Sequence, residues 1–420
     1  MRPRFNVPSI RRTIFLHLHI GTRSTDCEVG PVEALPDRGF VFWPVGCGDS
    51  TTVVLDSETV LQVDLHHVED SENEDDPRIP IIDELVVLLP EGSDGKPYLA
   101  AFGATHLDKD HVQGFAELLE RVTIGDLWFT PRVLWEQDQD EICEDAEAFA
   151  AEAKRRIAKM KADGNVESGD RIRIIGFAEA LEEHSDIYEN LPEGSVTVPG
   201  SEFHAIDGVD RSDVFRAFVH APFKEDAEAE RNHTSFGLQV TLSDGDTSAR
   251  ALLLGDLSYP VVKRIFERSE DDDLAWEIFV APHHCSKSVM YGADEGESED
   301  TLKHELLESI EAAAGENAYI LASSPAIPDK DEDGANPPHL IAAQRYRELV
   351  PAEHFLCTGE HPDANAPEPI VFAIDSDTVT LRAAASAAAA GTSTVPGAVD
   401  KAREASRPPA GAVGFGSKLA

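Results

Sequence analysis

The sequence predicts an α/β fold, because short strand-like runs alternate with amphipathic helical stretches over most of the chain. An apolar strand-like run at 98–102 passes into a polar loop and then into an amphipathic stretch at 112–122. The segment 40–65 contains three Val- and Leu-rich runs, separated by a glycine turn at Gly46 and Gly48 and by a turn at 56–58. In α/β proteins, ligands bind where a strand ends and its helix begins, so the end of the 98–102 run is the first place to look for a site.

The other elements follow the same alternation with one interruption. Strand-like runs are predicted at 124–131, 215–222, 236–242, 249–257, 276–284, 318–324, 354–359 and 369–375. Helices are predicted at 79–91, 301–315 and 338–349. Between residues 136 and 200 the alternation stops. Apolar residues at helical spacing from Ile142 to Met160 predict an inserted helical segment that ends near Gly164.

Three regions are expected along the chain. Residues 1–38 form an N-terminal extension, residues 39–382 form one domain that contains the insertion at 136–200, and residues 383–420 form a tail rich in Ala, Gly, Pro and Ser. Such low-complexity sequence can bury little apolar surface, so the tail is predicted to be disordered. Arg11 and Arg12 precede an apolar stretch as in an export signal, but the stretch is short and lacks a small-residue cleavage site.

Cysteine usage and hydropathy predict a cytoplasmic protein. The five cysteines are far apart and include no C-x-x-C pair, which fits neither a disulfide framework nor a structural zinc site. No apolar run approaches the ~20 residues that a membrane-spanning helix needs. The sequence therefore predicts no membrane association, and it leaves the oligomeric state open.

The chain is strongly acidic, since 79 Asp and Glu residues face 36 Lys and Arg residues, a net charge of −43. A large net charge opposes association, so adaptation to a salt-rich cytoplasm is the first interpretation, and an ordinary acidic protein is the alternative. Phosphate binding draws on Lys and Arg, which disfavours a long duplex as ligand. The basic stretch at 154–161 is better explained as a solvated helix in which Glu152 pairs with Arg156.

The loop after the 98–102 run carries a dense set of metal-type ligands. His106, Asp108, Asp110 and His111 fall within six positions. Imidazole and carboxylate together suit Zn²⁺, Mn²⁺ or Fe better than Ca²⁺. The alternative is a solvated acidic loop, in which Asp110 favours the N-terminus of the following helix.

Further candidate ligands follow other strand-like runs. Asp256 comes just past three leucines, after Gly255, where a buried carboxylate is costly unless it is paired or bound to a metal. His283 and His284 follow the next run, and His233 and His339 lie in short polar segments elsewhere. We expect these strand ends to converge on one edge of a sheet and form a metal or catalytic site.

The segments that carry these residues resemble, in this order, the metallo-β-lactamase fold. They are VGCGDS…VLQVDL, THLDKDHVQG, NHTS, LLLGD, PHHCSKS and NPPH, and they cover about 39–375 without the 136–200 segment. The resemblance is greatest to the metal-binding domain of ComEC-type competence and DNA-uptake proteins. It implies a four-layer αββα sandwich with the inserted helical segment added.

The resemblance also implies a ligand set. The family signature His-x-His-x-Asp-His falls on 106–111, with Asp108 in place of the second His, and Asp256 takes the place of the bridging carboxylate. His283 or His284 falls on the last ligand position. His233 falls on a further ligand position, for which Asn232 or no ligand is the alternative. Asp64 matches a strand-end Asp of the family, Cys285 stands where the family has Gly, and His66 and His67 receive no family role.

The activity that the resemblance implies is hydrolysis of a phosphodiester, as in a nuclease or nucleotide phosphodiesterase. One or two divalent ions, Zn²⁺ or Mn²⁺, would activate water, and Asp110 would orient it. Ser286, Lys287 and His339 would hold phosphate oxygens or protonate the leaving group. Two alternatives remain open: a hydrolase of a small ester, thioester or lactone, and a non-catalytic metal-binding partner in a defence or DNA-handling complex.

Overall fold

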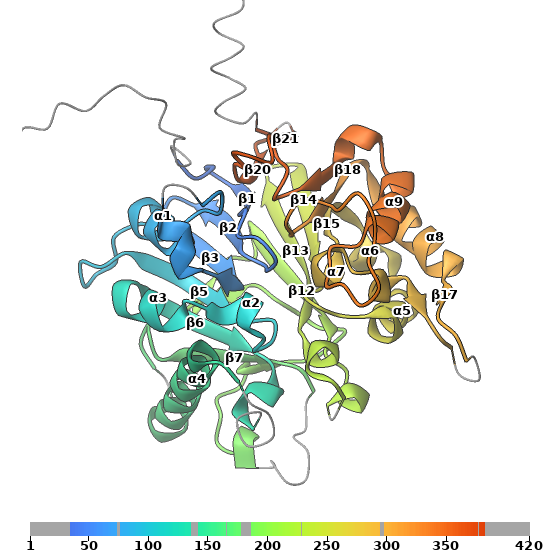
Figure 1. Cartoon of the computed structure of the whole chain (residues 1–420). Coiled ribbons are helices and arrows are strands. Elements are labelled where there is room, and N and C mark those ends of the chain that lie inside the picture. Colours follow the sequence, from blue (N-terminus) through green and yellow to red (C-terminus); the bar gives the residue numbers. More distant parts are fainter. Residues whose placement is uncertain are drawn as a thin grey trace, which may run out of the picture.

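The computed structural model of the chain describes residues 34–382, except 74–75, 136–141, 165, 178–185, 228, 295–297 and 377. Two mixed β-sheets lie face to face, and helices cover the outer face of each (Figure 1). Helices α1, α3 and α4 lie beside one sheet, and α5, α8 and α9 lie beside the other. The predicted four-layer αββα sandwich is therefore confirmed.

The first sheet contains nine strands and is parallel in its second half. In spatial order its strands are β21 (Val379–Leu381), β20 (Ile370–Ile374), β1 (Gly39–Phe42), β2 (Thr51–Asp56), β3 (Thr59–Val63), β5 (Tyr98–Gly103), β6 (Thr123–Phe129), β7 (Arg171–Ile175) and β8 (Val196–Thr197). The pairs from β3 to β8 are parallel. Parallel neighbours need crossover connections, which here pass through α1, α3 and α4.

The second sheet contains seven strands and changes from antiparallel to parallel at β14. Its order is β19 (Phe355–Cys357), β18 (Ala314–Ala322), β15 (Trp276–Val280), β14 (Thr247–Leu253), β13 (Gly237–Asp244), β12 (Phe215–Ala221) and β9 (Glu202–Phe203). Two small hairpins join β10 (Ala205–Ile206) to β11 (Val209–Asp210) and β16 (Tyr291–Gly292) to β17 (Thr301–Leu302). A short segment, β4 (Leu65–His66), pairs with the chain at Val112 and Gln113.

The helices of the described chain are mostly short. They are α1 (Ile81–Leu88), α2 (Lys109–Val112), α3 (Phe115–Arg121), α4 (Glu144–Asp163), α5 (Tyr259–Arg268), α6 (Asp271–Leu274), α7 (Pro282–Cys285), α8 (His304–Ala312) and α9 (Leu340–Leu349). The stretch expected as one helix at 112–122 is split into α2 and α3. Gly114 lies at the break with φ 93°, a left-handed conformation that favours glycine. The expectation of a wholly helical insertion at 136–200 is wrong, because β7 and β8 in this range are strands of the first sheet. The sequence analysis also did not predict α5.

Three apolar clusters fill the three interfaces between the four layers. One lies between α1, α3, α4 and the first sheet, one between the two sheets, and one between the second sheet and α5, α8 and α9. Phe115 on α3 and Phe149 on α4 meet in the first cluster, with ring centroids 4.8 Å apart. Helix α4, expected as part of an insertion, thus packs into the outer helical layer.

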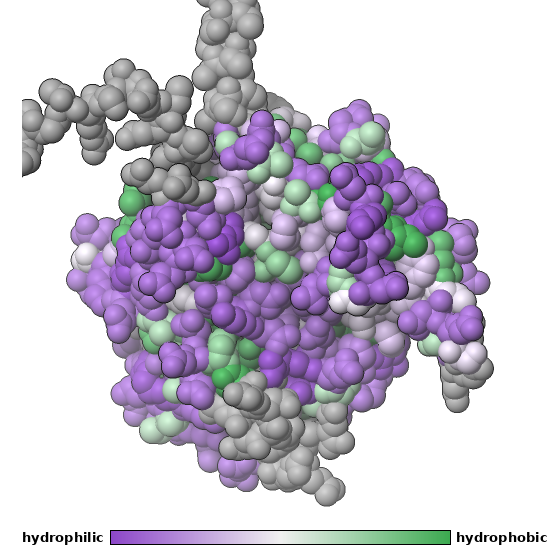
Figure 2. Space-filling model, viewed as in Figure 1, coloured by the Kyte–Doolittle hydropathy of each residue, from purple (hydrophilic) through white to green (hydrophobic). Residues whose placement is uncertain are grey.

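Several expectations fall outside the described residues. The extension at 1–33, the first residues of the expected insertion at 136–141 and the tail at 383–420 are among them. The division into extension, domain and tail stays a prediction. None of the helices in the described part combines the length and apolarity that crossing a bilayer requires. Hydrophilic residues cover most of the face seen in Figure 2.

Arg156 on α4 is buried, with 1% of its surface exposed, and fastens the helix to the first sheet. Its guanidinium donates to the carbonyls of Gly125 and Ile124 at 3.0 Å, and its Nε lies 2.7 Å from Glu152 Oε1. The predicted Glu152–Arg156 pair is therefore confirmed. This part of the basic stretch is also turned inward, where nucleic acid cannot reach it.

We expect Arg156→Met to lower the free energy of unfolding by about 3–5 kcal/mol, because Glu152 and the two carbonyls lose their buried partner. Urea unfolding followed by circular dichroism measures the change. Lys159→Met is the control, because Lys159 lies on the same helix with 48% of its side chain exposed. Equal stability of the two variants would show that Arg156 does not hold α4 in place.

Candidate metal centre

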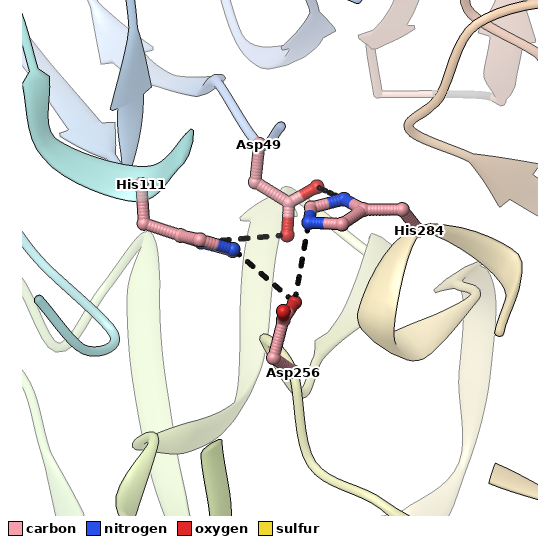
Figure 3. Close-up of side chains that lie close together, drawn as sticks. All are labelled: Asp49, His111, Asp256 and His284. Atoms are coloured by element: carbon pink, nitrogen blue, oxygen red, sulfur yellow. Dashed lines mark ion pairs between the residues drawn. The ribbon is translucent and has the colours of Figure 1, made fainter. Parts of the chain in front are cut away.

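Four segments that are far apart in the sequence meet at the ends of the two sheets. The loop after β5 carries the 106–111 motif, and the turn before β2 carries Asp49. The segment after β14 carries Asp256, and α7, directly after β15, carries His284. Figure 3 shows the side chains of Asp49, His111, Asp256 and His284 pointing toward one another from these segments. The expectation of one sheet edge is thus wrong, because the ligands come from both sheets.

One oxygen of the Asp256 carboxylate faces two imidazoles. Asp256 Oδ1 lies 3.2 Å from His111 Nε2 and 3.4 Å from His284 Nε2. His284 Nε2 also lies 3.2 Å from Asp110 Oδ2. Asp110, His111 and His284 therefore form one set of donors around Oδ1.

The other oxygen of Asp256 faces a second set. Asp256 Oδ2 lies 3.6 Å from His283 Nε2 and 4.0 Å from His106 Nε2. His106 Nε2 in turn lies 3.3 Å from Asp108 Oδ2, and Arg231 donates to the other oxygen of Asp108. The Asp256 carboxylate thus stands between two groups of imidazole and carboxylate donors.

Beyond these ion-pair contacts, the buried atoms that face one another in this cluster have no hydrogen-bond partner among the residues that the structure describes. They are His106 Nε2, His111 Nε2, His284 Nε2 and Asp256 Oδ1. Burying polar atoms without partners is costly, so a cluster of them needs compensation. Ligand atoms of Asp49, His111, Asp256 and His284 all lie within 4.8 Å of one another, and so do those of Cys47, Asp110 and His284. These residues fit divalent ions, since imidazole and carboxylate are donors that Zn²⁺ and Mn²⁺ accept.

Asp64 orients His111 toward the cluster. Asp64 Oδ2 lies 2.9 Å from His111 Nδ1, so Nδ1–H donates to it and Nε2 is left to face Asp256. The carboxylate also accepts from the backbone N–H of Thr105 at 2.7 Å and from its hydroxyl at 2.8 Å. Asp64 has φ 57°, a left-handed conformation that is uncommon outside glycine. The end of β3 thus holds the start of the motif loop.

The charges within the cluster stabilise one another. Burial by itself would raise the pKa of Asp256, but His284 and His111 hold it well below its usual range. Burial would lower the pKa of His111, yet Asp256 and Asp64 raise it well above its usual value. Carboxylates that favour a charged imidazole in this way also favour a divalent cation, so metal binding here would be coupled to proton release.

The backbone of α7 aims its two histidines differently. His283 and His284 both have φ 51°, and Cys285 has φ 65°. Three successive residues other than glycine in the left-handed region store strain of about 1–3 kcal/mol each. Cys285, which stands where the resemblance has Gly, is thus held in a left-handed conformation that favours glycine. As a result His284 is buried against Asp256 and Asp110, whereas 26% of the His283 side chain stays exposed.

Two residues of the cluster were not predicted as ligands. Asp49 Oδ1 lies 3.6 Å from His284 Nδ1, and the Asp49 N–H donates to the carbonyl of Asp110. The Cys47 thiol lies beside Asp110 and His284, and burial raises its pKa. A carboxylate and a thiol inside a glycine turn directly before a buried strand were the available signal.

The remaining predicted site residues lie as follows. His233 Nε2 lies 2.6 Å from Ser258 Oγ, so that nitrogen is engaged there. The Lys287 N–H donates to His339 Nδ1, and His339 Nε2 lies 3.2 Å from the carbonyl of Ala335. The Ser286 hydroxyl caps the turn at 287–289, and the Lys287 side chain is exposed. The roles expected for these four residues stay predictions.

Comparison with known proteins gives structural matches only. No family model matches the chain, and no curated protein sequence matches it. Among solved structures, the chain is similar to the Rm3 metallo-β-lactamase, at 13% identity over 90% of this chain and 99% of that chain, with a TM-score of 0.31. It is also similar to the class B3 di-zinc metallo-β-lactamase LRA-12 from an Alaskan soil metagenome, at 12% identity over 70% and 96% of the two chains, with a TM-score of 0.28.

A third similar structure is the metallo-β-lactamase SMB-1 bound to 2-mercaptoethanesulfonate. The identity is 11%, the match covers 60% of this chain and 80% of that chain, and the TM-score is 0.28. Scores this low carry no site or activity from one protein to another. The layers and the strand order alone therefore define the fold, and the resemblance to the DNA-uptake branch stays a prediction.

We expect Asp64→Asn to weaken Zn²⁺ binding about 10- to 100-fold, because the ring of His111 loses its charged partner. Equilibrium dialysis against buffered Zn²⁺ measures the change. Asp126→Asn is the control, because Asp126 is also buried but lines a separate cavity with Arg171 and Arg173. Unchanged affinity in Asp64→Asn would show that His111 needs no such support.

Proposed function

We propose that this chain is a metal-dependent hydrolase that cleaves phosphodiester bonds. The observation that carries the proposal is a set of buried atoms around Asp256 that have no hydrogen-bond partner in the described part of the chain: His106 Nε2, His111 Nε2, His284 Nε2 and Asp256 Oδ1 itself. Burying several charged and lone-pair-bearing groups close together destabilises a fold, so such clusters are typical of functional sites. A divalent ion is the ligand that compensates them.

Two sets of residues would hold the ions. Asp110, His111 and His284 surround one oxygen of Asp256, and His106, Asp108 and His283 surround the other. When bound, one or two divalent ions supply Lewis-acid activation of water and neutralise charge on the reacting phosphoryl group.

The protein's own groups complete the site. Asp64 and Thr105 fix the ring of His111, and the Asp49 N–H ties its turn to Asp110. Lys109, within the motif, and Lys287, two residues after α7, are both exposed. Cations at the rim would bind the non-bridging oxygens of a phosphodiester, which a neutral ester lacks. For this reason the proposal favours a phosphodiester over an ester, thioester or lactone.

The substrate would be short or single-stranded. A net charge of −43 opposes a long duplex, and the inward-facing Arg156 shows that not all basic residues are available at the surface. A nucleotide or a single strand needs only a few local cations. The sequence resemblance to DNA-uptake proteins also favours this class of substrate.

Removing two ligands should remove one bound ion and abolish hydrolysis. We expect Asp110→Ala/His111→Ala to lose one bound ion per chain and to show no hydrolysis of bis-p-nitrophenyl phosphate above the buffer blank. Metal content and rates would be measured with Zn²⁺ and with Mn²⁺, at low and high salt, and with single-stranded DNA as a second substrate. Metal binding without phosphodiester cleavage would favour an ester substrate or a non-catalytic role. No metal binding at all would contradict the proposal.

The class of substrate can be tested at the rim. We expect Lys287→Met to slow cleavage of bis-p-nitrophenyl phosphate about 10- to 100-fold, the equivalent of one charged hydrogen bond of about 1.5–3 kcal/mol. Hydrolysis of the neutral p-nitrophenyl acetate should be unchanged. Lys330→Met is the control, because Lys330 is 78% exposed and faces Glu332. An equal loss of rate on both substrates would show that Lys287 does not bind the negative charge of the phosphate.

A further inference from the structure

We propose that this protein has a second divalent-cation site, formed by His67, Glu72 and Glu117 and separate from the centre at Asp256. One donor atom from each of these residues lies within 4.8 Å of the other two. They come from three segments: the residue after β4, the short helix η1 (Glu69–Glu72) and the first turn of α3. None of them belongs to the donor sets around Asp256.

His67 is the observation that points to a ligand. Its ring is buried, with 5% of the residue exposed, and within the described ranges neither ring nitrogen has a hydrogen-bond partner. A neutral imidazole carries one donor and one acceptor, so a buried ring whose nitrogens make no hydrogen bond is poorly compensated. Its neighbour His66 lies toward Gly48 and the carbonyl of Asp110, whereas His67 packs against Gly114 on α3.

The two carboxylates complete the site from its solvent side. Glu72 Oε1 lies 3.5 Å from His67 Nε2, and 52% of the Glu72 side chain is exposed. Glu117 is 41% exposed and accepts a hydrogen bond from Arg121. A carboxylate has several lone pairs, so Glu117 can keep Arg121 and still offer an oxygen to an ion. The site is therefore open to ions from solvent while its imidazole is fixed inside the fold.

The donor set favours a transition-metal ion. One imidazole nitrogen with two carboxylates suits Zn²⁺ or Mn²⁺, and water would fill the remaining positions. Ca²⁺ and Mg²⁺ prefer oxygen donors throughout. The acidic residues Glu69 and Asp70 in the same short helix add to the local negative charge.

An ion at this site would brace the segment that carries the motif ligands. The backbone N–H of His67 donates to the carbonyl of Gln113 at 2.9 Å, between α2 and α3. Gly114 permits the close packing, because a Cβ there would lie 2.7 Å from His67 Cβ. Binding would tie β4 and η1 to α3, directly behind the helix that carries Asp110 and His111.

The test is a count of bound ions in variants that separate the two sites. We expect Glu72→Gln/Glu117→Gln to lose one Zn²⁺ per chain in equilibrium dialysis with elemental analysis. The same loss should follow when this pair is added to Asp110→Ala/His111→Ala. The control pair, Glu69→Gln/Glu120→Gln, changes the same charge on the same two elements through exposed side chains and should lose none.

Thermal unfolding gives a second measurement that does not depend on catalysis. Excess Zn²⁺ should raise the melting temperature of Asp110→Ala/His111→Ala by more than that of the combined variant, because an ion that binds only the folded state stabilises it. An unchanged ion count on adding Glu72→Gln/Glu117→Gln would overturn the second site, whatever the state of the centre. If Asp110→Ala/His111→Ala loses hydrolysis but keeps the ion at His67, Glu72 and Glu117, that loss concerns the proposed function and leaves the second site supported.

Discussion

The arrangement of the whole site depends on one buried carboxylate, that of Asp256, set among imidazoles at the place where two sheets end. With 3% of its surface exposed, it cannot be solvated, and in the described part of the chain the cationic groups within 4.0 Å of it are His111, His284, His283 and His106. Those rings come from both sheets. The sandwich must therefore close before the cluster can form, and the cluster in turn fixes how the two sheets meet at that end.

The support for this cluster runs back through the first sheet. Asp64 ends β3 in a left-handed conformation, binds Thr105 at the start of the motif loop and holds His111. The side chains of the next residues point in opposite directions, since His66 lies toward the Gly48 turn and His67 lies toward α3. A segment of four residues thus links the centre to the periphery. This link is why an ion at His67 would matter to the motif ligands without touching them.

Sequence reasoning predicted the fold class and most residues of the candidate metal centre, because His and Asp at strand ends can be recognised in the sequence alone. It missed Asp49 and Cys47, since a glycine turn gives no periodicity that shows where its side chains point. It placed the ligands on one sheet edge, because local patterns do not show how two sheets face each other. It left β7 and α5 unassigned. The sequence pattern also could not predict that Arg156 is buried, since burial of an arginine depends on the carbonyls that the fold brings to it.

The acidity of the chain constrains any nucleic-acid substrate more than the fold does. The basic stretch on α4 offers little to a phosphate backbone, since Arg155 pairs with Glu152 and Asp170, Arg156 faces the sheet and Lys159 pairs with Asp163. Recognition along a duplex requires many such cations, and each exposed pair must be broken before it can bind phosphate. A substrate that is bound only at the candidate metal centre would need for its recognition only the metal ions and the exposed lysines beside them. For the proposed phosphodiesterase activity, the charge distribution therefore favours substrates small enough for their phosphate to be the main point of contact.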